Sequence, residues 1–167
     1  MTHFLITPLS AVESHRHQAD HMVSFCAPGK ADEQPGGMAH HLILEFNDID
    51  RPIHGLLEPQ RHHVERYFET LSAWGRETPV LLHCWMGISR STAAALAGAA
   101  LFDPAQDMAV LAQRLRGLSP IATPNPLLIA HADAILGLEG RLVEAVKAIG
   151  RGADAYEGIP FTLVHAS

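Results

Sequence analysis

The sequence predicts an α/β fold: a mostly parallel central sheet of about four to five strands flanked by helices, with a helical C-terminal half. Two observations lead to this prediction. Short runs of branched apolar residues alternate with helical patterns from residue 3 to residue 102, which is typical of a parallel sheet covered by helices. Only helical patterns follow between residues 104 and 149. With 167 residues, 47% apolar and 18% charged, the chain suits one globular domain over 1–167.

The first expected elements are short. Residues 3–6 are expected to form a strand, and residues 8–17 begin a helix that has a proline early in its first turn. Residues 22–26 are expected to form a second strand, which the following Ala-Pro-Gly stops. Residues 30–39 are rich in turn formers and are expected to be a loop.

Two further strands enclose an amphipathic helix. Residues 41–46 show little alternation, which predicts a strand buried on both faces. Residues 79–83 predict a fourth strand, whose proline stands first, where its missing N–H does little harm. Residues 59–74 are the clearest amphipathic helix, with apolar side chains at three- and four-residue steps: Val64, Tyr67, Phe68, Leu71 and Trp74.

The segment 90–102 is rich in alanine and carries no charge after Arg90. Alanine favours helix, and a helix that is small and apolar on all sides belongs in the middle of a domain. Further helices are expected over residues 104–118 and 140–149.

One more helix is expected from residue 123 to about residue 138, with Thr123 as its cap and Pro124 in its first turn. The tail after residue 150 is less regular. Its segment 159–165, IPFTLVH, can dock as an extended strand.

Charge and composition exclude several classes of partner. The formal net charge of −6 disfavours binding to nucleic acid or to acidic lipid surfaces. Two cysteines make no disulfide framework, and the N-terminus lacks the features of a secretion signal. The longest apolar run, residues 92–102, is far too short for a membrane span. We therefore expect a cytoplasmic protein without nucleic-acid or membrane partners, and its oligomeric state is left open.

The segment 83-HCWMGISRST-92 places a cysteine where a strand meets a helix. The strand ends at His83, and the helix begins near Arg90. Backbone N–H groups of such a loop converge on one point, and the helix dipole makes that point attractive to an anion. Gly87 permits the tight backbone that this requires. The same surroundings stabilise a thiolate at Cys84.

This segment combines a sulfur nucleophile with a pocket for a tetrahedral anion. Arg90 can donate two parallel hydrogen bonds to phosphate oxygens, a geometry that lysine cannot reproduce. The chemistry that such a pair suits is transfer of a phosphoryl group to sulfur and then to water. A cysteine and an arginine at this spacing are weak evidence alone, and the strand, glycine and helix around them make the pattern specific.

The segment resembles the His-Cys-five residues-Arg-Ser/Thr motif of the cysteine-dependent protein tyrosine phosphatases, in their compact, dual-specificity-like bacterial branch. The similarity extends over about residues 40–136, with a Pro-Asn turn at residues 124–125. It implies Cys84 as nucleophile, Ser91 as a stabiliser of the leaving thiolate and His83 as a residue that tunes the cysteine. It implies no cofactor and no metal. The residues implied to bind phosphate are Trp85, Met86, Gly87, Ile88, Ser89 and Arg90.

A carboxylic acid should protonate the leaving oxygen, and two candidates stand in the loop 47–52. Asp48 and Asp50 both precede the cysteine by little more than 30 residues. In the resembled family the acid follows closely on a strand, which favours Asp48, and Asp50 stays the alternative. The one that is not the acid is expected to be a solvated turn residue.

The expected substrate is phosphotyrosine or another phosphorylated protein, or else a small phosphomonoester, because the interior of the cysteine loop carries no charge for additional phosphates. Two other functions stay open: a non-catalytic phosphate-binding interaction module, and a sulfurtransferase that uses the same loop. Trp85 either stacks against an aryl substrate or fills space beneath the loop. Cys26 is a core residue or a partner for Cys84 in a protective disulfide. The adjacent histidine pairs lack ligand spacing for a metal.

Overall fold

The computed structural model describes residues 1–165, so residues 166–167 of the expected domain lie outside the described residues. Its centre is one five-stranded sheet in the order β3-β2-β4-β1-β5. The first four strands are mutually parallel, and β5 runs antiparallel to β1. This confirms the predicted α/β class and the number of strands. The strands are β1 (Thr2–Pro8), β2 (His21–Cys26), β3 (His40–Glu45), β4 (Val80–Cys84) and β5 (Phe161–His165).

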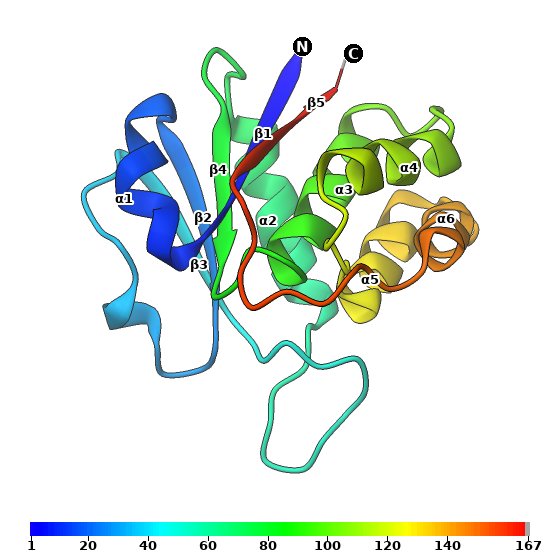
Figure 1. The fold of residues 1–167 in the computed structure, drawn as a ribbon, viewed down its shortest axis with the longest axis horizontal. Helices are drawn as coiled ribbons and strands as arrows, with labels where there is room; N and C mark the ends of the chain where they lie inside the picture. The colour runs from blue at the N-terminus through cyan, green and yellow to red at the C-terminus, as the bar shows by residue number, and fades with distance from the viewer. Residues whose placement is uncertain (166–167) are drawn as a thin grey trace.

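Helices cover the two faces of the sheet unequally (Figure 1). One face carries only α1 (Val12–His15) and short 3-10 turns beside it. The opposite face carries the remaining helices: α2 (Arg61–Ala73), α3 (Arg90–Phe102), α4 (Met108–Leu118), α5 (Pro126–Leu136) and α6 (Arg141–Ile149).

No helix of residues 1–165 is both long and apolar enough to cross a bilayer.

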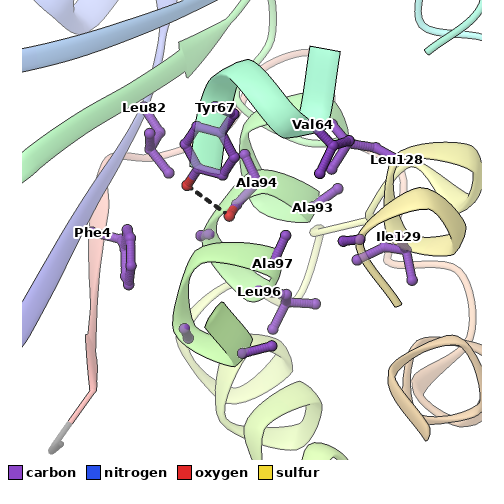
Figure 2. Close-up of a cluster of buried hydrophobic side chains, with 14 of the residues drawn as sticks. Phe4, Val64, Tyr67, Leu82, Ala93, Ala94, Leu96, Ala97, Leu128 and Ile129 are labelled. Carbon is purple, nitrogen blue, oxygen red and sulfur yellow. Dashed lines mark hydrogen bonds between the residues drawn. The ribbon is translucent and has the colours of Figure 1, made fainter. Parts of the chain in front are cut away.

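Helix α3 occupies the centre of the larger core, as its composition predicts. All of its residues from Arg90 to Ala100 are buried, and small side chains let the sheet and the neighbouring helices approach it closely. The hydroxyl of Tyr67 in α2 donates a 2.9 Å hydrogen bond to the carbonyl of Ala94 (Figure 2). The buried phenol is therefore satisfied, and α2 is held against α3.

Two local predictions are wrong. The strand expected to be buried on both faces lies at the sheet edge as β3, and of its residues only Leu44 is buried. The helix expected from Thr123 begins at Pro126, because the side chain of Asn125 accepts hydrogen bonds from two backbone N–H groups of its first turn. Pro126 rather than Pro124 takes the first helical position.

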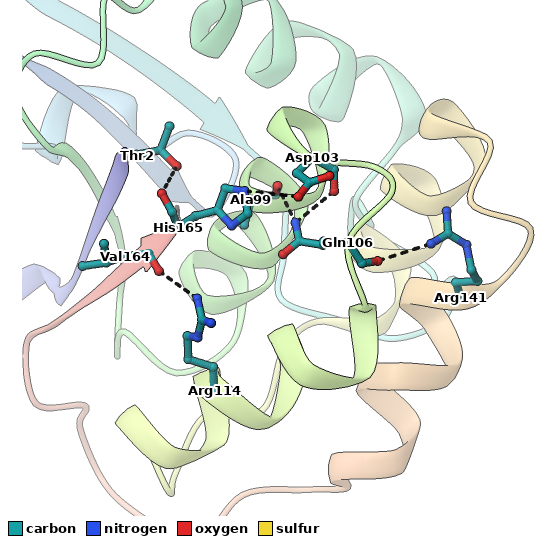
Figure 3. A network of polar contacts seen from close by, with 8 residues as sticks. All are labelled: Thr2, Ala99, Asp103, Gln106, Arg114, Arg141, Val164 and His165. Carbon is teal, nitrogen blue, oxygen red and sulfur yellow. Dashed lines mark hydrogen bonds and ion pairs between the residues drawn. The ribbon is translucent and has the colours of Figure 1, made fainter. Parts of the chain in front are cut away.

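The expected C-terminal strand is present as β5 and is tied to its surroundings by polar contacts (Figure 3). Arg114 donates to the carbonyl of Val164 at 3.2 Å, and the imidazole of His165 lies 4.0 Å from the carboxylate of Asp103. To reach β5, the chain after α6 crosses the carboxyl ends of the parallel strands (Figure 1). This return places residues 150–160 beside the loop that follows β4.

Candidate active site

An open cleft of about 1050 Å³ lies at the carboxyl ends of the parallel strands. Ligand sites of α/β sheets lie at this edge, where the loops that leave the strands converge. The lining comes from four separate segments of the chain. They are residues 48–51, residues 84–86 and 88–90, residues 121, 123, 125 and 126, and residues 151 and 153–156.

The loop after β4 is shaped by Gly87. This residue has φ of 69°, in the left-handed region that glycine adopts without strain. A Cβ built on it would lie 2.6 Å from the backbone nitrogen of Pro8 and 2.9 Å from the carbonyl carbon of Thr7. The loop therefore curls tightly against the end of β1, and only glycine fits at this point.

Replacing Gly87 with alanine is expected to lower the free energy of unfolding by about 2 kcal/mol, through the positive φ and the backbone clash. Urea denaturation measures the change. Gly117→Ala is the matched control, because Gly117 lies near the end of α4 with open space around it. That control should be neutral or stabilise by about 0.5–1 kcal/mol. Equal stability of the Gly87→Ala variant and the wild type would contradict the fit described here.

Cys84 ends β4 at the bottom of the cleft and is only 3% exposed. Its Sγ lies 3.2 Å from Oγ of Ser91, a residue of the first turn of α3. A hydroxyl at this distance can donate a hydrogen bond to a thiolate. The predicted pair is thus in contact.

Arg90, the first residue of α3, is buried beside the cysteine loop. Its Nη1 donates a 2.9 Å hydrogen bond to the carbonyl of Phe46, at the end of the β3 segment. Its Nε is buried and has no hydrogen-bond partner among residues 1–165. A buried donor of a cation without a partner is costly, and an anion in the cleft would satisfy it. The guanidinium is therefore held through one nitrogen while another N–H stays unpaired.

The two candidate acids, Asp48 and Asp50, have different hydrogen-bond partners. Oδ1 of Asp48 accepts hydrogen bonds from Oγ of Ser89 at 2.7 Å and from Nδ2 of Asn125 at 2.8 Å. Asp48 is thereby tied to the cysteine loop. Asp50 also lines the cleft and is exposed, as Asp48 is, but its side chain pairs with the neighbouring Arg51 at 3.4 Å and not with the cysteine loop.

Asn125 performs two tasks with one side chain. Its Oδ1 caps α5 by accepting from the backbone N–H groups of Leu127 and Leu128, each at 3.1 Å. Its Nδ2 donates to the Asp48 carboxylate and to the carbonyl of Ile49 at 3.1 Å. The sequence showed the Pro-Asn turn, but it did not show that this asparagine joins the end of one loop to the start of a distant helix.

His83 points away from the cysteine, to the other face of the sheet. Its Nε2 lies 2.5 Å from Oγ of Ser24, and the same hydroxyl lies 2.7 Å from Nε2 of His41. Burial, then the charges of His41 and Arg90, lower the pKa of His83 to about 4 from its ordinary value of 6.5. The imidazole is therefore neutral at neutral pH, and the expected tuning of Cys84 by His83 stays a prediction.

The free energy of unfolding is expected to fall as the pH falls from 6.5 towards 4. In this window His83 is protonated in the unfolded chain but stays neutral in the folded protein. The contribution of His83 to the free energy of unfolding is therefore fully present above pH 6.5 and is lost as the pH falls towards 4. The contribution is about 3 kcal/mol at most. The free energy of unfolding, measured by urea denaturation at several pH values in this range, should depend less steeply on pH for His83→Asn than for wild type. An unchanged slope would show that the buried imidazole titrates normally.

The sequence leaves two interpretations for Trp85 and two for Cys26, and the structure bears on both residues. Trp85 is 65% exposed at the cleft, so it does not fill space beneath the loop. Cys26 alternates with Phe25 along β2, and Phe25 shares the larger core with Cys84. The two cysteines therefore project from opposite faces of the sheet, and both are free. This arrangement disfavours a disulfide between them.

The wall formed by residues 151–156 was not anticipated. All of these residues except Gly152 line the cleft, although they carry no motif. The only signal in the sequence was the expected docking of segment 159–165, which requires the preceding residues to pass the strand ends.

The fold, a mostly parallel sheet with the cysteine loop between its central strand β4 and the buried helix α3, is similar to that of two solved human proteins with the dual-specificity and tyrosine phosphatase fold. Human DUSP28 aligns with this chain at a TM-score of 0.57 and 19% identity, over 86% of this chain and 92% of its own. Human tyrosine phosphatase-like serine/threonine/tyrosine-interacting protein aligns at 0.58 and 18% identity, over 80% and 91%. No family model and no curated protein matches the chain.

Proposed function

We propose that this protein is a phosphomonoester hydrolase that works through a cysteinyl-phosphate intermediate and needs no metal. The observation that carries the proposal is that three residues line one cleft: Cys84, Arg90 and Asp48. The buried Nε of Arg90 has no partner among residues 1–165, and the carboxylate of Asp48 accepts a hydrogen bond from Ser89 of the cysteine loop. A non-catalytic phosphate-binding module would need only the loop and the arginine, and a sulfurtransferase would need no carboxylic acid.

In the first step the Cys84 thiolate attacks phosphorus in line with the leaving oxygen. The S–P bond forms while the P–O bond breaks, and the electron pair leaves with the oxygen. Protonated Asp48 gives its proton to that oxygen. Arg90 and the loop N–H groups bind the equatorial oxygens, where charge accumulates in the transition state.

In the second step water attacks the phosphorus of the thiophosphate. Asp48, now a carboxylate, accepts the proton of the water as the S–P bond breaks. The electron pair returns to Cys84 as a thiolate, which Ser91 stabilises through the contact at 3.2 Å. Inorganic phosphate leaves, and both groups have returned to their starting protonation states.

We propose a phosphoprotein or a small, singly phosphorylated molecule as substrate. The interior of the cysteine loop is uncharged. Each additional arginine of the cleft pairs with an aspartate, Arg51 with Asp50 and Arg151 with Asp154 at 2.6 Å. No surplus of positive charge is left to bind further phosphates. A free nucleophilic thiol also fits a reducing, cytoplasmic compartment.

The proposal is tested by assaying the wild-type protein on phenyl phosphate with a metal chelator present, with and without vanadate. We expect turnover that the chelator does not reduce and that vanadate inhibits competitively. Vanadate binding without turnover would identify a phosphate-binding module instead. Thiosulfate-dependent transfer of sulfur to cyanide, without phosphate release, would identify a sulfurtransferase.

Asn125→Asp is expected to reduce kcat on phenyl phosphate by about tenfold with little loss of stability. The new carboxylate still caps α5, but it cannot donate to Asp48 and repels it when both are ionised. Asp107→Ala is the control, since Asp107 caps α4 in the same way and does not line the cleft. It should cost about 1 kcal/mol of stability and leave kcat unchanged. The reverse pattern would exclude positioning of Asp48 by Asn125.

A further inference from the structure

The two edges of the sheet differ in how their backbone groups are covered. At the β5 edge, Arg114 of α4 donates to the carbonyl of Val164 at 3.2 Å. At the opposite edge, β3 has no neighbouring strand other than β2 among residues 1–165. Its six residues, HHLILE, contain no proline and no lysine, and they pair with β2 without a bulge. Proteins use those devices to keep an edge strand from pairing, so β3 is open to a further strand.

The hydrogen bonds to β2 determine which backbone groups of β3 point outward. The N–H groups of His40, at the start of β3, and Phe46, directly after its end, donate to backbone carbonyls of the β2 segment at 3.3 and 2.8 Å. Backbone groups alternate in direction along a strand, so those of the even-numbered residues face β2. The N–H and C=O groups of His41, Ile43 and Glu45 therefore face away from the sheet.

This outward row is complementary to itself in an antiparallel arrangement. The two residues of a hydrogen-bonded antiparallel pair exchange both of their N–H···O=C bonds. Only one register pairs all three outward residues of one copy with the three of another. It places Ile43 opposite Ile43, and His41 opposite Glu45 on each side of the two-fold axis. An apolar contact thus lies at the centre, between two pairs of an imidazole and a carboxylate.

The side chains of the row are held by their own subunit and keep a free atom each. They share one face of the sheet, because alternate residues of a strand do. Nε2 of His41 lies 2.7 Å from Oγ of Ser24, which leaves Nδ1 for a further partner. Oε1 of Glu45 accepts from the N–H of Gly29 at 2.7 Å, which leaves Oε2. Ile43 is only half-buried.

We propose that the β3 edge is an interface between two copies of this chain, which pair their β3 strands antiparallel with Ile43 on the two-fold axis. The two five-stranded sheets join into one continuous sheet. The two β3 strands run in opposite directions, so the clefts at the carboxyl ends of the parallel strands open at opposite ends of the dimer. The dimer leaves both clefts accessible, and the inference does not depend on the proposed function.

Sedimentation equilibrium of the full chain tests the interface. We expect a monomer–dimer equilibrium with a Kd on the order of 10–100 μM, because the contact of two short strands buries little surface. Ile43→Lys places two ammonium groups together at the axis and should raise this Kd at least about tenfold. Val164→Lys is the matched control, since Val164 is a half-exposed residue of the other edge strand, and it should leave Kd unchanged.

An exchange of charges tests the register. His41→Glu should abolish self-association, because carboxylates then face each other on both sides of the axis. Glu45→Lys should weaken it, because the imidazole loses its carboxylate. An equimolar mixture of the two variants should form a heterodimer, in which the new carboxylate faces the new ammonium and the original pair is kept on the other side. Urea denaturation of each variant shows whether it is folded.

A disulfide provides a second measure of the register. Cα atoms of a hydrogen-bonded antiparallel pair lie about 5.5 Å apart, which suits a disulfide. Ile43→Cys, in a chain that also carries Cys26→Ala and Cys84→Ser, should therefore form a covalent dimer on mild oxidation, and Val164→Cys in the same background should not. A wild-type chain that stays monomeric up to about 1 mM would overturn the inference. A dimer that Ile43→Lys does not weaken would do so too, as would a mixture of the two charge variants that stays monomeric.

Discussion

Cys84→Ser is expected to lower the rate of phenyl phosphate hydrolysis by a factor of at least about 10⁴. The serine hydroxyl is nearly isosteric with the thiol, but an alcohol is a much weaker acid than a thiol and stays protonated at neutral pH. A neutral hydroxyl is a weak nucleophile, and the side chain hydrogen-bonded to Sγ of Cys84 within residues 1–165 is the hydroxyl of Ser91, which is no base. Initial rates measured by phosphate release give the change.

Cys26→Ala is the matched control for the nucleophile. Both cysteines are buried and free, but Cys26 lies on the opposite face of the sheet. Its replacement should leave kcat within about a factor of two, with a modest loss of stability from the smaller side chain. The Cys84→Ser protein should still bind vanadate, which shows that the loop is intact. Retained hydrolysis by Cys84→Ser would remove sulfur from the mechanism.

Asp48→Asn is expected to lower kcat on phenyl phosphate by about 10²–10³, because the amide has no proton to give to the phenolate. The amide oxygen can still accept from Ser89 and Asn125, so the loop should stay in place. With dinitrophenyl phosphate, whose leaving group needs no proton, the loss should be within about tenfold. Steady-state kinetics on the two esters measure the contrast.

Asp50→Asn serves as the control, because Asp50 lines the same cleft only two residues away and pairs with Arg51 at the surface. An exposed pair of this kind contributes little, and the variant should keep its kcat. If Asp50→Asn showed the leaving-group dependence and Asp48→Asn did not, the roles of the two aspartates would be exchanged.

The cysteine loop could be predicted from the sequence because its parts are neighbours in the chain. A strand, a glycine and a helix placed around Cys84 and Arg90 determine which N–H groups converge, whatever surrounds them. The buried position of α3 also followed from composition, since an uncharged, alanine-rich helix has no surface that favours water. The resemblance to a bacterial branch of the family stays a prediction, because the structural neighbours described above are human proteins.

Other parts of the site could not be predicted, since they depend on which strand lies beside which. The strand expected in the interior became the edge strand β3, because an apolar run does not encode the order of strands in a sheet. Asp48 rather than Asp50 contacts the cysteine loop, and Asn125 holds Asp48 in that position. Because Asn125 is 77 residues away from Asp48, this contact could not be seen in the sequence. The aromatic wall at Tyr156 depends on the docking of β5.

The sequence by itself determined the local arrangement on which the proposed chemistry depends: a cysteine, an arginine and a hydroxyl at spacings that place them in one loop and the first turn of the helix that follows. Only the tertiary structure decided that Asp48 contacts Ser89 of the cysteine loop, that Asn125 holds Asp48 there, and that Trp85 and Tyr156 line the same cleft. The physical reason is the distance along the chain over which each effect acts. Local backbone geometry acts over a few residues and can be recognised in a short segment, whereas contacts between distant segments arise only when the packing of the sheet and helices selects one arrangement of the whole chain.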